Sequence, residues 1–344
     1  MTASHVVRRA VLGFVAAAAL SGTSLPALAQ GVVNVYTNRE PGLYSATLDE
    51  FTKATGIKVN AIFSEQGLAE RIRAEGVNSP ADVLITVDIG RVREAVDLGI
   101  AQPIRSEILA ANIPAQFRDP DGHWFGLSLR ARTVYASKER VKDEALTYES
   151  LADPKWKGKI CTRSFQHQYN IALVAAHLVK HGEAKTEEWL KGVKANLAKK
   201  PSGGDRDVAK DIAAGVCDIG LGNQYYIGLM TNGSADQKKW VEAVRVILPS
   251  FEGGGTHLNV SGAVVAKNAP NRDNAIKLVE YMTSSDAQRV FADVNFEYPV
   301  RPGIQVNTLV KSFGDLKPDA MLVADIAKMR AKASELVDKV AFDR

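Results

Sequence analysis

Short apolar runs alternate with amphipathic segments along most of this chain, and this alternation is the strongest constraint on its fold. Residues 32–36 and 81–87 are apolar runs bounded by turn residues, which is typical of buried strands, and residues 57–63 alternate as a strand does. Between the strands at residues 32–36 and 57–63, a helix with one apolar face is predicted to end at Gly56. Strand–helix alternation predicts an α/β fold with a parallel sheet.

The second half of the chain continues in the same style. Strands are predicted at residues 156–162, 217–222 and 260–266, and helices at 170–181, 186–200, 205–215, 274–283, 286–294 and in the tail from about 318. A length of 344 residues suits two domains or lobes. The excess of 43 Lys and Arg over 39 Asp and Glu is too small to indicate a nucleic-acid partner, so none is expected.

The first residues have the pattern of an export signal. Arg8 and Arg9 precede an apolar run at residues 10–20, and Ala27-Leu28-Ala29 then matches an A-x-A cleavage site. The run is shorter than the roughly 20 residues that span a bilayer, and no later run is longer, so no stable membrane insertion is expected. We predict a signal peptide at residues 1–29, with export by the Sec or twin-arginine route left open. Its removal lowers the formal charge from +4 to +2.

The predicted export also bears on the state of the two cysteines. An exported protein matures in an oxidising space, so Cys161 and Cys217 are a candidate disulfide, with two unpaired buried thiols as the alternative. Two cysteines also exclude a disulfide-dense scaffold and a cysteine-rich metal site.

Motifs of enzymes are missing from the sequence. It contains no G-x-S-x-G, P-loop, H-E-x-x-H or G-x-G-x-x-G pattern. The glycine-rich residues 252–257 are interpreted as a flexible turn. His177 and His181 are spaced i,i+4 without an adjacent Glu, and we interpret them as an exposed helix face. The chain is therefore expected not to be an enzyme.

Three tyrosines offer the most informative chemistry. Ligands of open α/β sheets bind at the carboxyl ends of strands, where residues 37–43, 86–90, 163–169 and 223–226 form polar loops. Tyr225 and Tyr226 stand side by side in the last loop, and Tyr169 ends the third. Phenolate oxygens are hard donors suited to a trivalent cation such as Fe³⁺, whose charge deprotonates the phenol. Aromatic packing or stacking on an organic ligand is the alternative.

Several segments resemble the periplasmic ferric-ion-binding proteins of bacterial ABC iron importers. The similarity covers nearly all of residues 31–310 and is carried by residues 35–41, 78–88, 124–132 and 223–226, with the adjacent Tyr-Tyr pair as its most specific mark. The resemblance implies a two-lobed periplasmic-binding-protein fold, α/β in class, with hinge strands and a cleft between the lobes. It assigns Tyr169, Tyr225 and Tyr226 as phenolate ligands from the second lobe.

The first lobe departs from the common pattern of that family. Many relatives carry a His in the first loop, where this chain has Glu40-Pro41, and Val87 stands where some relatives carry a Glu. The resemblance is to a subgroup that completes the metal shell with a carbonate-type anion. Arg132, and secondly Arg39, are the predicted anion ligands, because a guanidinium fork fits a planar anion; a surface salt bridge is the alternative for each. Glu40 is an alternative direct iron ligand.

These observations lead to one main function and one alternative. The chain is predicted to capture Fe³⁺ in the periplasm, as a monomer, and to deliver it to the permease of an inner-membrane ABC importer. The alternative is a binding protein for a small organic ligand, such as a polyamine or an anion. The predicted organisation places lobe 1 at residues 30–132 and 255–310, lobe 2 at 133–254, and C-terminal helices at 311–344. The preference between Fe³⁺ and Fe²⁺ stays open.

Overall fold

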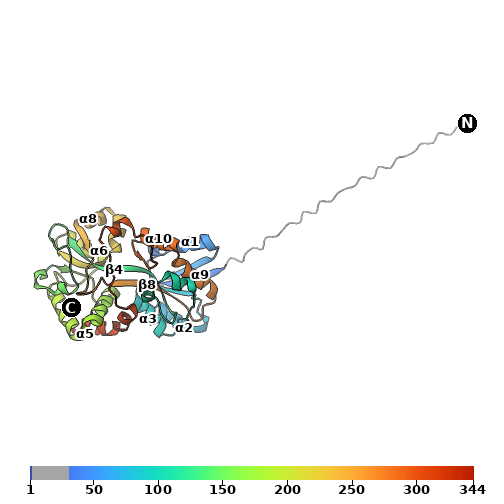
Figure 1. Cartoon of the computed structure of the whole chain (residues 1–344), viewed down its shortest axis with the longest axis horizontal. Helices are drawn as coiled ribbons and strands as arrows, with labels where there is room; N and C mark the ends of the chain where they lie inside the picture. Colours follow the sequence, from blue (N-terminus) through green and yellow to red (C-terminus); the bar gives the residue numbers. More distant parts are fainter. Residues whose placement is uncertain (2–30) are drawn as a thin grey trace. The chain divides into compact units, whose positions relative to one another are not determined.

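The computed structural model describes Met1 and residues 31–344, so the predicted signal peptide lies outside the described residues apart from its first residue. Figure 1 shows α5, α6 and α8 on one side of the central strands β4 and β8, and α1, α2 and α9 on the other. The strands are β1 (Val32–Thr37), β2 (Lys58–Phe63), β3 (Val83–Thr86), β4 (Phe125–Ser137), β5 (Ile160–Cys161), β6 (Ile219–Asn223), β7 (Val244–Ile247), β8 (Leu258–Val265) and β9 (Tyr298–Pro299).

Helices connect these strands. The longer ones are α1 (Ser45–Thr55), α2 (Leu68–Glu75), α3 (Ile89–Asp97), α5 (Gln168–Ala195), α6 (Asp205–Ala213), α8 (Ala235–Ala243), α9 (Arg272–Met282), α10 (Ser285–Asp293) and α13 (Arg330–Lys339). The shorter ones are α4 (Glu107–Asn112), α7 (Tyr225–Thr231), α11 (Thr308–Lys311) and α12 (Val323–Lys328), with short 3-10 helices that include η4 (Glu149–Ala152). Most predicted elements lie where the sequence pattern indicates, with ends shifted by a few residues.

Two glycines with positive φ angles end helical segments. Gly56 follows α1 with φ 71°, a left-handed conformation that glycine adopts without a Cβ penalty. The helices predicted at residues 170–181 and 186–200 form one element, α5, which is interrupted at Gly182 with φ 77° and ψ 175°. The break therefore falls inside the gap that the sequence indicates.

The sheet is mixed, which corrects the prediction of a parallel sheet. β1 pairs in parallel with β2 and β3, and β5 pairs in parallel with β6. β8 is antiparallel to β3 and to β4, and β4 is antiparallel to β6 and β7. The parallel prediction rested on the first strand–helix units, where β1 does pair in parallel with β2 and β3.

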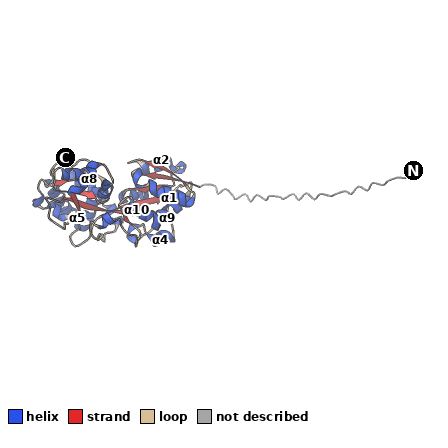
Figure 2. Ribbon diagram, turned by 90° about the horizontal axis from the view of Figure 1, so that it is seen from above, coloured by secondary structure: helices blue, strands red, loops and turns tan. Residues whose placement is uncertain are grey.

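Strand β4 belongs to both halves of the sheet. Its residues from Phe125 to Ala131 pair with β8, and those from Arg132 to Ala136 pair with β6. All thirteen residues of β4 are buried. Figure 2 shows the strands in two groups, each surrounded by helices.

Two large hydrophobic clusters lie on either side of this junction. One packs β1, β3 and β8 against α1, α3 and α9, and the other packs β6 against α5. Ile326, Ala333, Leu336 and Val337 of the C-terminal helices join the second cluster, where α13 packs along α5. Val323 and Ala327 of α12 join the first cluster, so the C-terminal helices contribute to both cores. The exact lobe boundaries given above stay a prediction.

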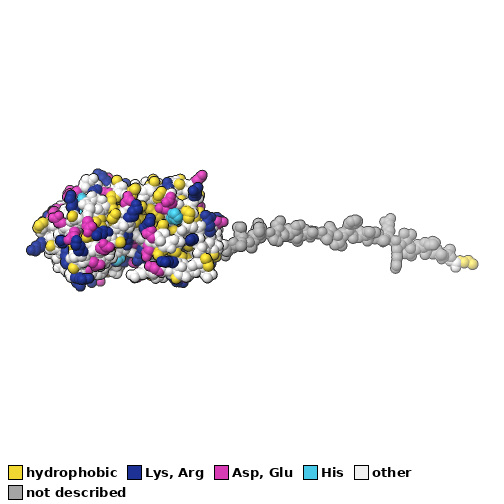
Figure 3. Space-filling model, turned by 90° about the horizontal axis from the view of Figure 1, so that it is seen from below, with side chains coloured by type: hydrophobic (Ala, Val, Ile, Leu, Met, Phe, Trp, Pro, Cys, Tyr) yellow, Lys and Arg dark blue, Asp and Glu magenta, His cyan; other side chains and the backbone are white. Residues whose placement is uncertain are grey.

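The surface agrees with a small net charge. Acidic and basic side chains are interspersed on the face that Figure 3 shows. Among the described residues, no helix has both the length and the apolar character needed to cross a membrane.

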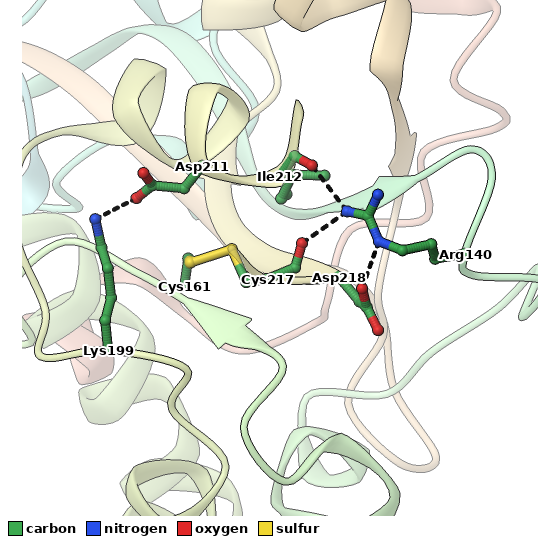
Figure 4. The surroundings of a disulfide bond; sticks show 7 residues. All are labelled: Arg140, Cys161, Lys199, Asp211, Ile212, Cys217 and Asp218. Atoms are coloured by element: carbon green, nitrogen blue, oxygen red, sulfur yellow. Dashed lines mark hydrogen bonds and ion pairs between the residues drawn. A yellow bond between two sulfur atoms is a disulfide. The ribbon is translucent and has the colours of Figure 1, made fainter. Parts of the chain in front are cut away.

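Cys161 and Cys217 form a disulfide in the second lobe, with their Cα atoms 5.9 Å apart and 56 residues between them in sequence. Figure 4 shows the bond between β5 and the segment that leads into β6, near the ion pairs Lys199–Asp211 and Arg140–Asp218. Both cysteines are buried. The bond links the chain ahead of residues 163–169 to the chain ahead of residues 223–226.

Removal of this disulfide should destabilise the protein. The double variant Cys161→Ala/Cys217→Ala frees a long loop in the unfolded chain, so we expect the free energy of unfolding to fall by about 2–4 kcal/mol. Urea denaturation followed by circular dichroism measures the change. The reduced wild-type protein is the matched control, and equal stability of oxidised and reduced protein would contradict the expectation.

Candidate functional site

The four polar loops predicted at the strand ends meet at one cleft. The cleft has a volume of about 490 Å³ and is lined from the first lobe by Asn38, Glu40, Leu43 and Val87, among others. The second lobe contributes residues of the 163–169 loop together with Tyr225 and Tyr226. All three predicted tyrosine ligands therefore line the same cleft.

Tyr169 is positioned by the beginning of α5. His167 caps this helix, and its Nδ1 accepts a hydrogen bond from the backbone N–H of Tyr169 at 3.2 Å. The two rings lie 4.7 Å apart, edge to face. Because Nδ1 accepts this bond, the proton of a neutral His167 ring is on Nε2. Burial, with a smaller effect of Arg163, lowers the pKa of His167 to about 3, so the ring is neutral.

Tyr225 and Tyr226 begin α7 directly after β6. Their ring centroids lie 4.1 Å apart, and both side chains are buried. Gln224 holds this corner to the centre of the sheet, because its Oε1 accepts from Ala131 N at 2.8 Å and its Nε2 donates to Phe296 O at 2.9 Å. The pair is thus fixed to the β4 junction rather than to a free loop.

Guanidinium groups surround the three phenol rings. The Cζ of Arg130 lies 5.5 Å from the ring centroid of Tyr169 and 5.9 Å from that of Tyr225. The Cζ of Arg163 lies 5.4 Å from Tyr169, and that of Arg206 lies 4.7 Å from Tyr226. This arrangement favours negative charge on the phenol oxygens.

Burial acts in the opposite direction. It is the largest cause that raises the pKa of Tyr225 well above 10, followed by the neighbouring Tyr169 and Tyr226. The pKa of Tyr226 is likewise raised, first by burial and then by Tyr169. The phenols of Tyr225 and Tyr226 are therefore neutral near pH 7 unless a strongly charged cation binds among them.

Arg132 and Arg39 do not line the cleft, although both are the predicted anion ligands. Arg132 is fully buried and donates to Asp205 Oδ2 at 2.6 Å and to Asn170 Oδ1 at 2.7 Å. Arg39 is also buried, and its Nη2 lies 2.9 Å from both carboxylate oxygens of Glu297. Neither arginine forms the predicted alternative of a surface salt bridge, because both pairs are internal.

Glu40 also lines the cleft, from the loop that follows β1. Its side chain is 57% exposed, and its Oε2 lies 3.9 Å from Arg206 Nη2. An exposed pair at this distance contributes little stability. It does place the carboxylate of Glu40 next to the guanidinium that covers Tyr226.

Some residues of the site escaped the sequence analysis. Arg163, His167 and Arg330 line the cleft, and Arg330 is paired with the buried Asp88. Arg163 and His167 stand in a loop that the sequence predicts as polar, so their place was available from the pattern. Arg330 comes from the C-terminal helices, and no local signal connects it to this cleft.

The histidine pair on α5 differs from the prediction. His177 is buried, with 2% of its surface exposed, and stacks on Trp189 at 4.5 Å. The interpretation of this pair as an exposed helix face is therefore wrong for His177. The sequence shows the helix period, but it does not show that η4 and the 251–252 segment cover this side of α5.

The fold and the cleft define a two-lobed α/β binding protein, and comparisons with known proteins specify its family. The model of the bacterial extracellular solute-binding protein family matches residues 78–328. Iron uptake protein A1 of Synechocystis sp. (strain ATCC 27184 / PCC 6803 / Kazusa) is 43% identical over 316 residues, which cover 91% of this chain and 88% of that protein. The chain therefore belongs to the bacterial extracellular solute-binding proteins, in the group of iron uptake and ferric-iron-binding members.

Solved structures agree with this assignment. The Bordetella ferric binding protein is 54% identical, with a TM-score of 0.85 over 91% of this chain and 100% of that chain. A Trichodesmium protein in complex with iron and citrate is 44% identical, with a TM-score of 0.86 over 91% of this chain and 100% of that chain. The family consists of solute-binding proteins, which confirms the expectation that the chain is not an enzyme and confirms the predicted periplasmic-binding-protein fold.

The buried Asp205 makes the stability of the fold depend on pH. Burial raises the pKa of Asp205, but Arg132, Arg163 and the backbone N–H of Asn223 outweigh burial and lower it below the usual value. A depressed carboxyl pKa stabilises the fold above the unfolded pKa of about 3.9, and this stabilisation is lost as pH falls further. Asp205→Asn leaves Arg132 buried without its charge partner, so we expect a loss of about 3–5 kcal/mol at pH 7.

Urea unfolding at pH 7 and at pH 3 tests this expectation. The variant should lose less stability between the two pH values than the wild-type protein. Asp236→Asn is the control, because the Asp236 side chain is 75% exposed in a surface pair with Lys239. Similar losses in both variants would contradict a special role of Asp205.

Proposed function

We propose that this chain captures Fe³⁺ in the periplasm with the phenolates of Tyr169, Tyr225 and Tyr226. The observation that carries the proposal is the meeting of the three tyrosines in one cleft under Arg130, Arg163 and Arg206. Family membership and the iron-binding relatives support it. The tyrosine-mediated binding is our own inference for this chain.

The electrostatics suit a trivalent cation. Three phenolates carry three negative charges, which balance Fe³⁺ in a site where an uncompensated charge would be expensive. The raised pKa values of these two phenols make the cleft selective for an ion that displaces their protons.

A further anion would complete the coordination shell, and we propose that Arg163 supports it. Arg132 and Arg39 each have a carboxylate partner inside the protein. Arg163 lines the cleft, and its Nη1 lies 3.5 Å from Asp205 Oδ1, a carboxylate that Arg132 already shares. The proton on His167 Nε2 is a second donor on the same wall. Carbonate or a carboxylate such as citrate, which accompanies iron in the Trichodesmium relative, fits these donors.

Glu40 is our proposed contribution of the first lobe. It lines the cleft beside Arg206, the arginine that covers Tyr226, and its carboxylate oxygen is a hard donor. Closure of the lobes would bring it toward the metal. The loaded protein would then deliver iron to the permease of an inner-membrane ABC importer, which is the partner class of its family.

The tyrosine ligands can be tested by colour. Fe³⁺ bound to phenolates gives a visible charge-transfer band, so the loaded wild-type protein should be coloured. In Tyr225→Phe/Tyr226→Phe we expect the band to be lost and iron to dissociate more readily. Absorption spectra of the purified loaded proteins measure both effects.

Tyr281→Phe/Tyr298→Phe is the matched control, because it removes two phenol oxygens outside the cleft. An unchanged band in the Tyr225/Tyr226 variant, or no band in the wild-type protein, would refute tyrosine ligation.

Thermal shifts with polyamines and small organic anions test the alternative ligand class, since a true ligand raises the melting temperature strongly. Acid should release iron from the wild-type protein, because protons compete for the phenolates.

The anion can be tested separately. Iron affinity should rise when carbonate or citrate is supplied, and Arg163→Gln should remove about 1.5–3 kcal/mol of that gain, the value of a hydrogen bond to a charged group. Competition with a chelator, with and without the anion, measures the gain. Arg140→Gln is the control, because Arg140 pairs with Asp218 away from the cleft. An equal gain in the Arg163 variant and the wild-type protein would exclude Arg163 as the anion ligand.

A further inference from the structure

A second cluster of metal-ligating side chains lies on α5, away from the cleft. One ring nitrogen each of His177 and His181 and one carboxylate oxygen of Glu149 all lie within 4.8 Å of one another. The histidines are one helical turn apart on α5, and Glu149 begins η4. His177 is eight residues after Tyr169, which is about 12 Å along a helix that rises 1.5 Å per residue. None of the three residues lines the cleft of the tyrosines.

The hydrogen bonds around His177 fix its tautomer. The hydroxyl of Thr186 donates to Gly182 O at 2.7 Å, so the same hydroxyl must accept from His177 Nδ1, which lies 2.8 Å away. The ring proton is therefore on Nδ1, and Nε2 carries a free lone pair.

That lone pair is buried without a partner. His177 Nε2 has no hydrogen-bond partner among the residues that the structure describes. A buried acceptor left unsatisfied costs about 1–3 kcal/mol, which native proteins rarely tolerate without a reason. A metal ion is one such reason, and an outer donor bond from the other ring nitrogen is the usual support of a histidine ligand.

His181 and Glu149 supply the other two ligand atoms of the cluster. His181 Nε2 lies 2.6 Å from Glu149 Oε1, and Glu149 Oε2 accepts from Glu252 N at 3.1 Å. The side chains of His181 and Glu149 are each 16% exposed, which gives an ion a path from solvent. The backbone bond from Glu252 orients the carboxylate in the way that supports a metal ligand.

We propose that Glu149, His177 and His181 bind a divalent transition-metal ion of the Zn²⁺ type. Two imidazoles and one carboxylate with an open fourth position are a ligand set that Zn²⁺ accepts, at 2.0–2.2 Å for nitrogen and oxygen. The ion replaces the proton between His181 Nε2 and Glu149 Oε1, and that proton moves to His181 Nδ1, so the ligating ring is neutral. The bound ion fastens η4 to α5 directly before the break at Gly182.

The test uses the mature protein with Tyr225→Phe/Tyr226→Phe, so that the cleft does not bind the added metal. Zn²⁺ titration by calorimetry after chelator treatment should give one site per chain and a raised melting temperature. Loss of a hydrogen bond that supports a metal ligand lowers metal affinity by about 10–100-fold. His181→Gln and Glu149→Gln each remove a proposed ligand itself, so each should weaken Zn²⁺ binding by at least about tenfold. Thr186→Val, which frees the His177 tautomer, should weaken it by about 10–100-fold.

His123→Gln is the matched control, because His123 and Asp119 form a histidine–carboxylate pair at 3.0 Å elsewhere on the protein. Its Zn²⁺ affinity should equal that of the parent. Circular dichroism of the metal-free variants shows whether each one folds, and the visible spectrum of Co²⁺-loaded parent reports four-coordinate ligation without reference to stability. No binding by the parent, or equal binding by the His181 and Glu149 variants, would overturn the proposal.

Discussion

One buried carboxylate organises the tyrosine side of the cleft. Asp205 Oδ2 accepts from Arg132 at 2.6 Å and from the backbone N–H of Asn223 at 2.9 Å, two residues before Tyr225. Arg132 in turn donates to Asn170, the neighbour of Tyr169 in sequence. The two segments that carry the phenols are thus joined through a single ion pair at the β4 junction. Because both partners of the pair are fully buried, either one alone would be an uncompensated charge in the core.

The sequence pattern predicts much of this fold because short-range periodicity reports which face of a strand or helix is buried. β1, β2, β3, α1 and α6 lie close to their predicted positions, and the four loops that end predicted strands do meet at one cleft. The long strand β4 carries Arg130 and Arg132 in a fully buried segment. Its partners Asp205 and Glu297 come from distant parts of the chain, and local pattern cannot show such pairing. For the same reason the sequence predicted Arg132 and Arg39 as ligands of an anion, although each arginine is paired with a buried carboxylate of the protein itself.

The two proposed metal sites differ in chemistry as well as in place. The tyrosine cleft offers phenol oxygens under positive guanidinium groups, which suits a small ion of high charge. The cluster on α5 offers neutral imidazole nitrogen and one carboxylate, which suits a softer divalent ion. Both sites lie along the same helix, with Tyr169 in its first turn and His181 directly before its break at Gly182. The helix would therefore carry one site for the transported ion and one for an ion that remains.

The disulfide adds a consequence for how the transported ion could leave. Cys161 and Cys217 lie ahead of the loops that bear Tyr169 and the Tyr225–Tyr226 pair, so all three phenols belong to one cross-linked body. Opening and closing of the two lobes would leave the distances among the phenols unchanged. Release would then depend on the groups that arrive from outside this body, namely Glu40, the supporting anion and protons. The permease would act on Glu40 and the supporting anion, and the arrangement of the three phenolates would stay intact for the next ion.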